Sequence, residues 1–326
     1  MLGELILPIT INEGEYDNSF VCSPYSYFIS YARQSLDSFP PTWFYQSMDA
    51  LLRVFGSLFR KLQFNKVVIV NNWLYATNLY PPLNPSQLLK ITQFLQETFP
   101  DHTIVFRSID PCTNPTCYQE LQKIGFNYVA SRQIFFLNAN DSSFFESRLF
   151  KSDLKLLKNS GYEVIDSKEI KEEDIPRLLK LYRDLYIGKY STLNPQFNEE
   201  YLHLALKHHV LHFKALKKEG RIDGVIAYVE CSGKMYCPFF GYDRDLPKEN
   251  SLYRILSTVL MCEAHERKLF FHQSSGASMF KKMRKAQDCI EYHAIYNKHL
   301  KISRRIPWIM LRSLYNTIGK IYMKRY

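Results

Sequence analysis

The hydrophobic pattern between residues 234 and 285 predicts a strand, a loop, a helix, a strand, a turn and a helix, in that order. Residues 235–242 form an aromatic run typical of a buried strand, and residues 243–250 form a charged loop. Apolar residues then recur at helical spacing after Asn250 and Ser251, which are both good N-caps. A helix N-terminus that faces strand ends favours phosphate binding.

The first half of the chain repeats this alternation of strands and helices. We expect helices over 43–62, 86–99 (capped by Ser86) and 115–124, and strands over 66–72, 102–108 and 127–137. In the second half we expect a strand from 161, helices over 172–188 and 198–208, and hairpin strands over 211–217 and 222–231. The pattern therefore predicts an α/β fold with a mixed sheet, built from two structurally similar halves in tandem.

Charge separates the two halves more clearly than composition does. The chain has 326 residues, which is enough for two medium domains, and its formal net charge is +10. Residues 1–150 hold 10 Lys and Arg against 12 Asp and Glu, whereas residues 151–326 hold 32 against 20. We therefore expect domains at 1–150 and 151–300, followed by a basic amphipathic tail at 301–326.

The seven cysteines are scattered and lie mostly in apolar surroundings. This predicts reduced core thiols and a cytoplasmic protein. Cys112 and Cys117 have no second pair at ligand spacing, so we expect no metal site. No run of 18 apolar residues is present, and no basic segment opens a signal peptide.

The predicted order of elements resembles the GNAT acyltransferase fold. The chain is similar to the Fem-type branch with two GNAT-like halves, and most similar to a bacterial group known only as GNAT family N-acetyltransferases. This resemblance covers about residues 18–326. The residues that carry it are Asn71-Asn72-Trp73-Leu74, Phe106-Arg107-Ser108, Ser131-Arg132-Gln133, Tyr186 to Pro195, Gly241-Tyr242-Asp243 and Gly276-Ala277.

The resemblance implies a thioester donor, either acyl-CoA or an acyl carrier protein, bound between the central strand and the next helix. Most GNAT proteins hold the CoA pyrophosphate with a glycine-rich loop, whereas residues 244–252 contain no glycine. Residues 73–85 also lack glycine, so we expect the first half to bind no cofactor and to shape the acceptor side. The donor-binding residues expected in the second half are Phe240, Gly241, Arg244, Lys248, Asn250, Ser251, Tyr253 and Arg254.

Acyl transfer to an amine needs a general base, an oxyanion donor and an acid for the leaving thiolate. We expect the oxyanion donor to be a backbone N–H near a bulge around residues 239–241. His272 is the better candidate base and Asp243 the second, although a core histidine and an Asx turn would explain them equally. Tyr242 and Tyr253 are candidate acids, and core packing is the alternative for both.

Other polar residues are candidates for acceptor or partner binding. Lys189 and Tyr190 lie in the loop that acceptors approach in the GNAT fold, and Ser274 and Ser275 precede Gly276. Solvated loop and turn residues are the alternatives. The run of basic residues at 281–285 would suit an acidic partner such as an acyl carrier protein or tRNA, or would be a solvated face.

The tail pattern places aromatic and apolar residues on one side of a helix and basic residues on another. Residues 303–326 would therefore contact a membrane surface, unless the apolar face packs on the body of the protein.

The expected function is N-acyl transfer from a thioester to a small-molecule or lipid amine, in the cytoplasm or at the inner membrane surface. Two alternatives are a Fem-like transferase that uses aminoacyl-tRNA and a lipid-binding module without catalysis.

Overall fold

The computed structural model describes residues 5–36 and 42–319, and the chain folds into two compact units. Unit 1 comprises residues 1–133, 193–195 and 289–326, and unit 2 comprises residues 134–192 and 196–288. The chain thus leaves unit 1 within one strand, returns to it for residues 193–195 and joins it again at Cys289; the domain bounds expected at 150 and 300 stay a prediction.

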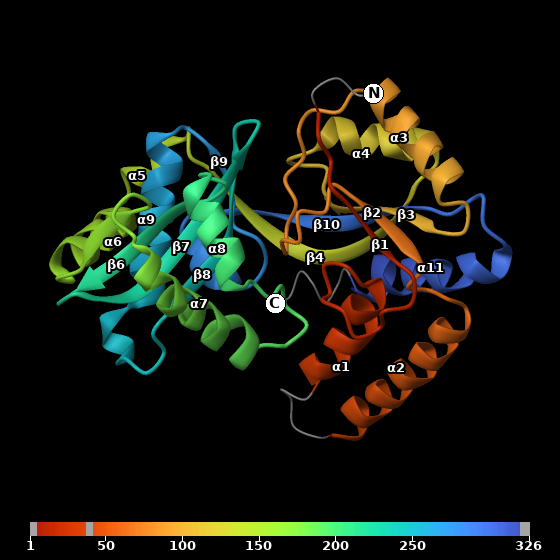
Figure 1. Cartoon of the computed structure of the whole chain (residues 1–326), viewed down its shortest axis with the longest axis horizontal. Helices are drawn as coiled ribbons and strands as arrows, with labels where there is room; N and C mark the ends of the chain where they lie inside the picture. The colour runs from red at the N-terminus through yellow and green to blue at the C-terminus, as the bar shows by residue number, and fades with distance from the viewer. Residues whose placement is uncertain (1–4, 37–41, 320–326) are drawn as a thin grey trace. The chain divides into compact units, whose positions relative to one another are not determined.

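Unit 1 is a small mixed sheet with helices on both faces (Figure 1). In the sheet β1 is antiparallel to β2, β2 is parallel to β3, and β3 is antiparallel to β10. The elements are β1 (Ile9–Asn12), η1 (Ser26–Ser30), α1 (Tyr31–Leu36), α2 (Trp43–Lys61), β2 (Val67–Val70), α3 (Pro85–Thr98), β3 (Thr103–Ile109), α4 (Pro115–Ile124), β4 (Asn127–Asn138, shared with unit 2), β10 (Gln287–Tyr296, from residue 289), α11 (Ile302–Leu314) and η5 (Tyr315–Gly319).

Side-chain alternation in β2 explains why both faces of this sheet are covered. Val68 and Val70 pack with α3 and α4, while Val67 and Ile69 pack with α2 and α11. The predicted helix starts and stops are close to those observed. The cap of α3 is Asn84, which forms a capping box with Gln87, and not Ser86 as we expected.

The tail helix α11 packs on unit 1 through its apolar face. Trp308 and Leu311 are 3% and 2% exposed and belong to the core with Phe59 and Phe64. The described part of residues 303–326 therefore supports body packing over a membrane-surface helix, and residues 320–326 lie outside the described residues. No helix in the described ranges is long and apolar enough to cross a membrane.

Unit 2 is built on β8, which lies in the middle of its sheet. Four strands pair antiparallel in the order β8, β7, β6, β5, and β9 pairs parallel to β8 and antiparallel to β4. The elements are α5 (Ser142–Phe145), α6 (Arg148–Asn159), β5 (Glu163–Asp166), η2 (Glu172–Asp174), α7 (Ile175–Arg183), η3 (Asp184–Gly188), α8 (Glu199–Lys207), β6 (His212–Lys218), β7 (Arg221–Cys231), β8 (Lys234–Tyr242), η4 (Lys248–Asn250), α9 (Leu252–Glu266), β9 (Phe270–His272) and α10 (Ser278–Met283).

Helices α7 and α9 cover opposite faces of β8 (Figure 1). Phe239 stacks on Tyr182 of α7 with ring centroids 4.7 Å apart. The next residue, Phe240, meets Tyr253 of α9 at 5.5 Å. Since successive strand residues point to opposite faces, one aromatic pair fixes each helix to the central strand.

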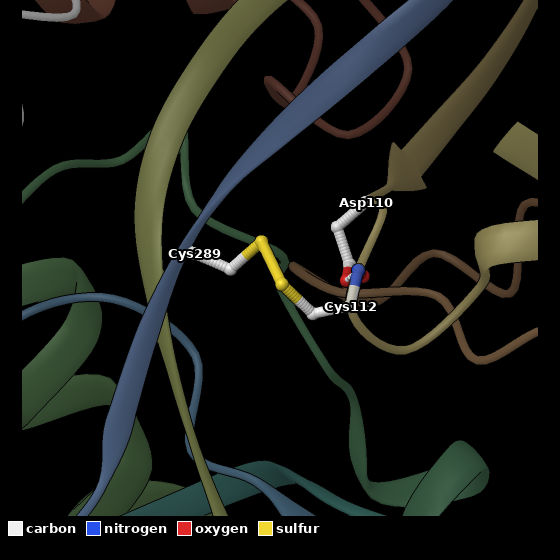
Figure 2. A group of neighbouring side chains, drawn as sticks. All are labelled: Asp110, Cys112 and Cys289. Atoms are coloured by element: carbon white, nitrogen blue, oxygen red, sulfur yellow. Dashed lines mark hydrogen bonds between the residues drawn. A yellow bond between two sulfur atoms is a disulfide. The ribbon is translucent and has the colours of Figure 1, made fainter.

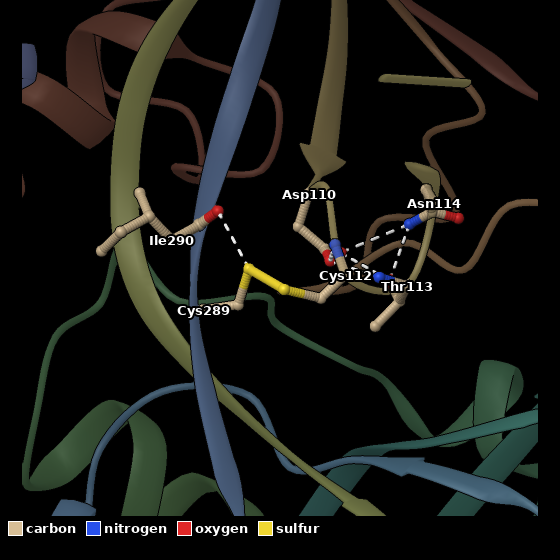
Figure 3. Close-up of a disulfide and its surroundings, with 6 residues drawn as sticks. All are labelled: Asp110, Cys112, Thr113, Asn114, Cys289 and Ile290. Carbon is tan, nitrogen blue, oxygen red and sulfur yellow. Dashed lines mark hydrogen bonds between the residues drawn. A yellow bond between two sulfur atoms is a disulfide. The ribbon is translucent and has the colours of Figure 1, made fainter. Parts of the chain in front are cut away.

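A disulfide in unit 1 corrects the expectation that all seven cysteines are reduced. Cys112, in the loop after β3, is bonded to Cys289 at the start of β10, with Cα atoms 6.7 Å apart (Figures 2 and 3). Asp110 lies beside the pair, and its buried carboxylate accepts hydrogen bonds from the Cys112 and Thr113 backbone N–H groups. The cysteine pattern missed this bond because its partners are 177 residues apart.

The remaining cysteines are free thiols in the structure. We therefore predict that, without reductant, a thiol reagent in denaturant titrates only the five free cysteines: Cys22, Cys117, Cys231, Cys237 and Cys262. After reduction all seven should react. Seven reactive thiols in the unreduced protein, purified under air, would show that the Cys112–Cys289 bond does not form.

Candidate functional site

The central strand β8 parts from its neighbour β9 halfway along its length. The two strands pair from Lys234 to Tyr236, and β9 ends at His272, which lies opposite Tyr236. The chain after His272 stays with β4, because Gln273 N–H donates to Phe135 O and Phe135 N–H to Ser274 O. From Cys237 onward, the edge of β8 that faces β9 is therefore no longer paired with it.

A β-bulge marks the point where the strands part. On the β7 side the register shifts, so that Cys237 and Pro238 of β8 together stand opposite Tyr228. A bulge bends its strand and increases its twist, and proline has no N–H to give to a ladder. We expected the bulge around 239–241, and it lies just before that segment.

Backbone alternation identifies which groups of β8 face the open edge. Asp243 N–H donates to Asp223 O of β7 at 2.8 Å, and these residues lie opposite each other. In an antiparallel ladder such bonded pairs alternate with unbonded ones, so Gly241 also bonds to β7. The N–H groups of Phe240 and Tyr242 therefore point away from β7, toward the open edge.

Gly241 allows helix α7 to approach β8 closely. A Cβ atom at this position would lie 2.6 Å from the Leu181 carbonyl carbon and from the Tyr182 nitrogen. Because both are backbone atoms, no side-chain rotation could relieve the overlap. Gly241 was predicted to bind the donor, and in the structure it sets the distance between strand and helix.

Lys281 holds the other wall of the opening, the segment that follows β9. This side chain is 7% exposed, and its Nζ donates to the carbonyls of Gln273 and Ser275 at 2.6 and 2.8 Å. A third carbonyl, of Ser274, lies at 3.4 Å. The sequence pattern placed Lys281 in a basic surface run, so its role was missed. The side chains of Ser274 and Ser275 stay candidates for substrate binding.

Aromatic rings line the α9 side of the open edge. Tyr253 lies 5.5 Å from Phe240, 6.4 Å from Tyr242 and 5.1 Å from Phe280, measured between ring centroids. Burial raises the pKa of Tyr253 to about 12, so its hydroxyl stays protonated at neutral pH. The structure thus brings together three residues that the sequence named separately.

His272 lies at the apex of the opening and is 3% exposed. Its Nδ1 accepts the Ser274 backbone N–H at 3.1 Å. An amide N–H can only donate, so in neutral His272 the proton sits on Nε2. The ring is then a donor at Nε2, which is unsuited to the general-base role expected for it.

Asp243 is engaged in an ion pair. Its Oδ2 accepts from Arg177 at 2.7 Å and its Oδ1 from the Asp245 N–H at 3.0 Å, which closes an Asx turn. Burial raises its pKa, but the hydrogen bonds from Arg177 and Asp245 outweigh burial and hold it below the usual value. Such a carboxylate is a weak base, so the Asx-turn alternative describes this residue better.

The loop between β8 and α9 satisfies two of its own backbone N–H groups. Asn250 N–H donates to Pro247 O and Ser251 N–H to Lys248 O, which closes the single turn η4. Ser251 is the N-cap of α9, as expected, but it has φ of 52° and its side chain makes no cap hydrogen bond. These two N–H groups are therefore already used, and residues 244–252 contain no glycine that would let the backbone approach a phosphate closely.

The charged residues expected at this loop have other partners. Arg254 Nε donates to Asp153 at 2.6 Å, and Arg244 donates to the Asp184 carbonyl at 3.0 Å. Asp153 is fully buried and also binds Arg284 at 2.9 Å. Arg254 and Arg284 thus anchor helix α6, a role that the sequence did not indicate. Lys248 is exposed.

The loop after α7 carries the predicted acceptor residues. Helix α7 continues into the π-helical turn η3, and a cavity of about 310 Å³ is lined there by Arg183, Asp184, Ile187, Gly188 and Gln196. Just beyond it Lys189 and Tyr190 are both exposed, with the Lys189 Nζ 4.9 Å from the Tyr190 ring centroid. Acceptor binding stays a prediction for this pair.

In this unit, β8 parts from its parallel neighbour and helix α9 starts beyond its end. Residues 150–282 match the family model described as acetyltransferase (GNAT) domain. This stretch, and not the whole second half of the chain, carries the match to a GNAT domain. No curated protein sequence matches the chain.

Solved structures show that the GNAT fold extends beyond this domain. The chain is similar to FemX, at 9% identity and a TM-score of 0.54 over 69% of this chain and 80% of that one. It is similar to L-PGS from Bacillus licheniformis, at 14% identity and a TM-score of 0.51 over 70% and 78%. It is also similar to the C-terminal domain of a protein from Agrobacterium fabrum that is named as a putative lysylphosphatidylglycerol synthetase. The identity is 11% and the TM-score 0.50, over 71% of this chain and 77% of that one. The predicted tandem, Fem-like GNAT architecture is confirmed.

The ion pair of Asp243 makes a prediction about stability and pH. Because the folded-state pKa is lowered, the carboxylate stabilises the fold above the unfolded pKa of about 4, and this contribution is lost as pH falls through the folded-state value. Asp243→Asn keeps an acceptor oxygen for the Asx turn but removes the ion pair. We expect a loss of about 1–3 kcal/mol at pH 7, shrinking toward pH 3, in denaturant unfolding. An equal loss at both pH values would contradict this account.

Proposed function

We propose that this chain is an N-acyltransferase that moves an acyl group from a thioester donor to an amine. The observation that carries the proposal is the open edge of β8, where the Phe240 N–H points away from β7 beside a bulge. A thioester carbonyl laid along this edge would accept that N–H, which is how a backbone donor stabilises a developing oxyanion. The edge lies in the GNAT domain.

The residues around the edge support the rest of the reaction. As the amine nitrogen bonds to the carbonyl carbon, the C–S bond breaks and the sulfur needs a proton. Tyr253 retains its proton at neutral pH and lies 5.5 Å from Phe240 between ring centroids, so we assign it this role, with Tyr242 beside it. The proton of the amine passes to solvent.

The donor is acyl-CoA or an acyl carrier protein. Both present the same thioester on the same kind of flexible arm, and an open strand edge binds such an arm by backbone hydrogen bonds. The two donors differ at the other end of this arm, where CoA carries its pyrophosphate. The glycine-free loop is not built to bind that group. We therefore assign recognition of the acyl group and arm to β8, and not to the loop.

The acceptor is a small-molecule or lipid amine that reaches the site along η3. Lys189 and Tyr190 are exposed there, next in sequence to the cavity at residues 183–188. One structural neighbour is named for lysylphosphatidylglycerol, which makes a lipid acceptor one candidate to include in a test.

A Fem-like transferase that uses aminoacyl-tRNA is the second candidate. The observation that favours it is the absence of glycine from the loop after β8, because a tRNA-borne ester has no CoA pyrophosphate to be held. Steep salt dependence of tRNA binding and transfer from aminoacyl-tRNA would support this candidate over the thioester.

The direct test is a panel of acyl-CoA, acyl carrier protein and aminoacyl-tRNA donors with mixed amine acceptors. We expect transfer from a thioester, and a fall in kcat of about 100-fold in Tyr253→Phe with little change in KM. The matched control is Tyr162→Phe, because burial also raises the pKa of Tyr162 to about 12. The Tyr162 hydroxyl donates a hydrogen bond to Asp223 and does not lie at the open edge. No transfer from any thioester, or equal losses in both variants, would contradict the proposal.

A further inference from the structure

Helix α6 of unit 2 carries a stripe of four basic side chains, which we name the α6 stripe: Arg148, Lys151, Lys155 and Lys158. All four are solvent-accessible on this helix. At about 100° per residue they fall within about 80° of the helix circumference, over a length of about 15 Å. The opposite side of the helix packs on the core through Phe150 and Asp153. Basic charge is thus concentrated on the solvent face of one helix.

No acidic residue of the helix offsets this charge. The single acid of α6, Asp153, is fully buried and bound by Arg254 and Arg284. Among the described residues, none of the four stripe side chains takes part in an ion pair. The helix dipole favours Lys158, in the last turn of α6, but does not explain Arg148, the first residue, where positive charge opposes the dipole.

The α6 stripe is fixed to the helix that begins beside the proposed donor edge. Arg254, in the first turn of α9, donates to Asp153 Oδ1 and to Ser152 Oγ, both in the middle of α6. The α9 helix follows directly on the loop from the end of β8. A partner docked on α6 would therefore lie at the end of β8 and α9 from which a thioester arm enters.

We propose that the α6 stripe is the docking surface for an acidic carrier protein that presents the acyl group as a thioester on its prosthetic arm. The inference rests on the proposed function and names the donor of that site. Charge complementarity carries it: four basic groups outside any ion pair, spaced by three or four residues, match acids at the same spacing on a partner helix. If the carrier protein itself binds the α6 stripe, the enzyme does not need a glycine-rich loop to hold the donor by its phosphate.

Two features of the stripe favour a protein partner over RNA. It spans about 15 Å, which is three turns of one facing helix. It also has an apolar neighbour, Leu154, that is 37% exposed. Single-stranded RNA is bound by aromatic stacking and arginine, whereas three of the four stripe residues are lysines and α6 exposes no aromatic ring. An apolar residue with a polar rim is typical of a protein interface.

The test compares two charge-reversal variants of the full chain. The stripe variant is K151E/K155E/K158E, and the matched control is K90E/K168E/K207E, which changes the net charge equally at exposed lysines elsewhere. We expect kcat/KM with an acyl carrier protein to fall at least 10-fold in the stripe variant and less than 2-fold in the control. With the same acyl group on pantetheine alone, both variants should match the unaltered chain.

Other outcomes separate this inference from the proposed function. Transfer from the carrier that is equally strong in the stripe variant would overturn the docking surface and leave acyl transfer standing. A stripe variant that loses only aminoacyl-tRNA binding would overturn it in favour of RNA. Equal loss with acyl-pantetheine would show that the substitutions damage the catalytic unit and would also overturn it. Absence of any thioester transfer by the unaltered chain would overturn the proposed function itself.

Discussion

The β-bulge at Cys237 and Pro238 is the constraint on which the second unit depends. It lies where β9 ends and the chain after β9 follows β4, so that β8 has no strand partner on that side beyond Tyr236. The pairing ends at Tyr236 and His272, and the segment from Phe239 to Tyr242 keeps one bonded edge and one open edge. The site therefore consists of backbone groups of β8 that have no strand partner, held in place by the pairing of β8 with β7.

Two buried contacts position the elements on either side of the opening. Gly241 brings α7 against one face of β8 at a distance that no other residue would allow, while Lys281 binds three carbonyls of the segment after β9. Neither contact touches the open edge. Both act on backbone atoms, so they fix the opening more firmly than side-chain packing would.

The hydrophobic pattern predicts the helices and strands well because each has a clear period, as in α9 and β8. It fails where a residue's role depends on distant partners. Asp243 was a candidate base until Arg177, 66 residues away, was seen to bind it. Lys281 and Arg284 read as a solvated basic run, yet one binds carbonyls and the other a buried carboxylate. Long-range pairings such as Cys112 with Cys289 leave no local signal at all.

The central claim is that donor binding uses the open edge of β8, and amide hydrogen exchange measured residue by residue by NMR tests it most directly. With a non-hydrolysable acyl-thioester analogue, exchange at the Phe240 and Tyr242 amides should slow by at least about 10-fold, because each gains a hydrogen bond to the donor. The Gly241 amide, which bonds to β7, should already be protected and should change little. Equal protection of all three amides in the free protein, or no change at Phe240 on binding, would contradict the account.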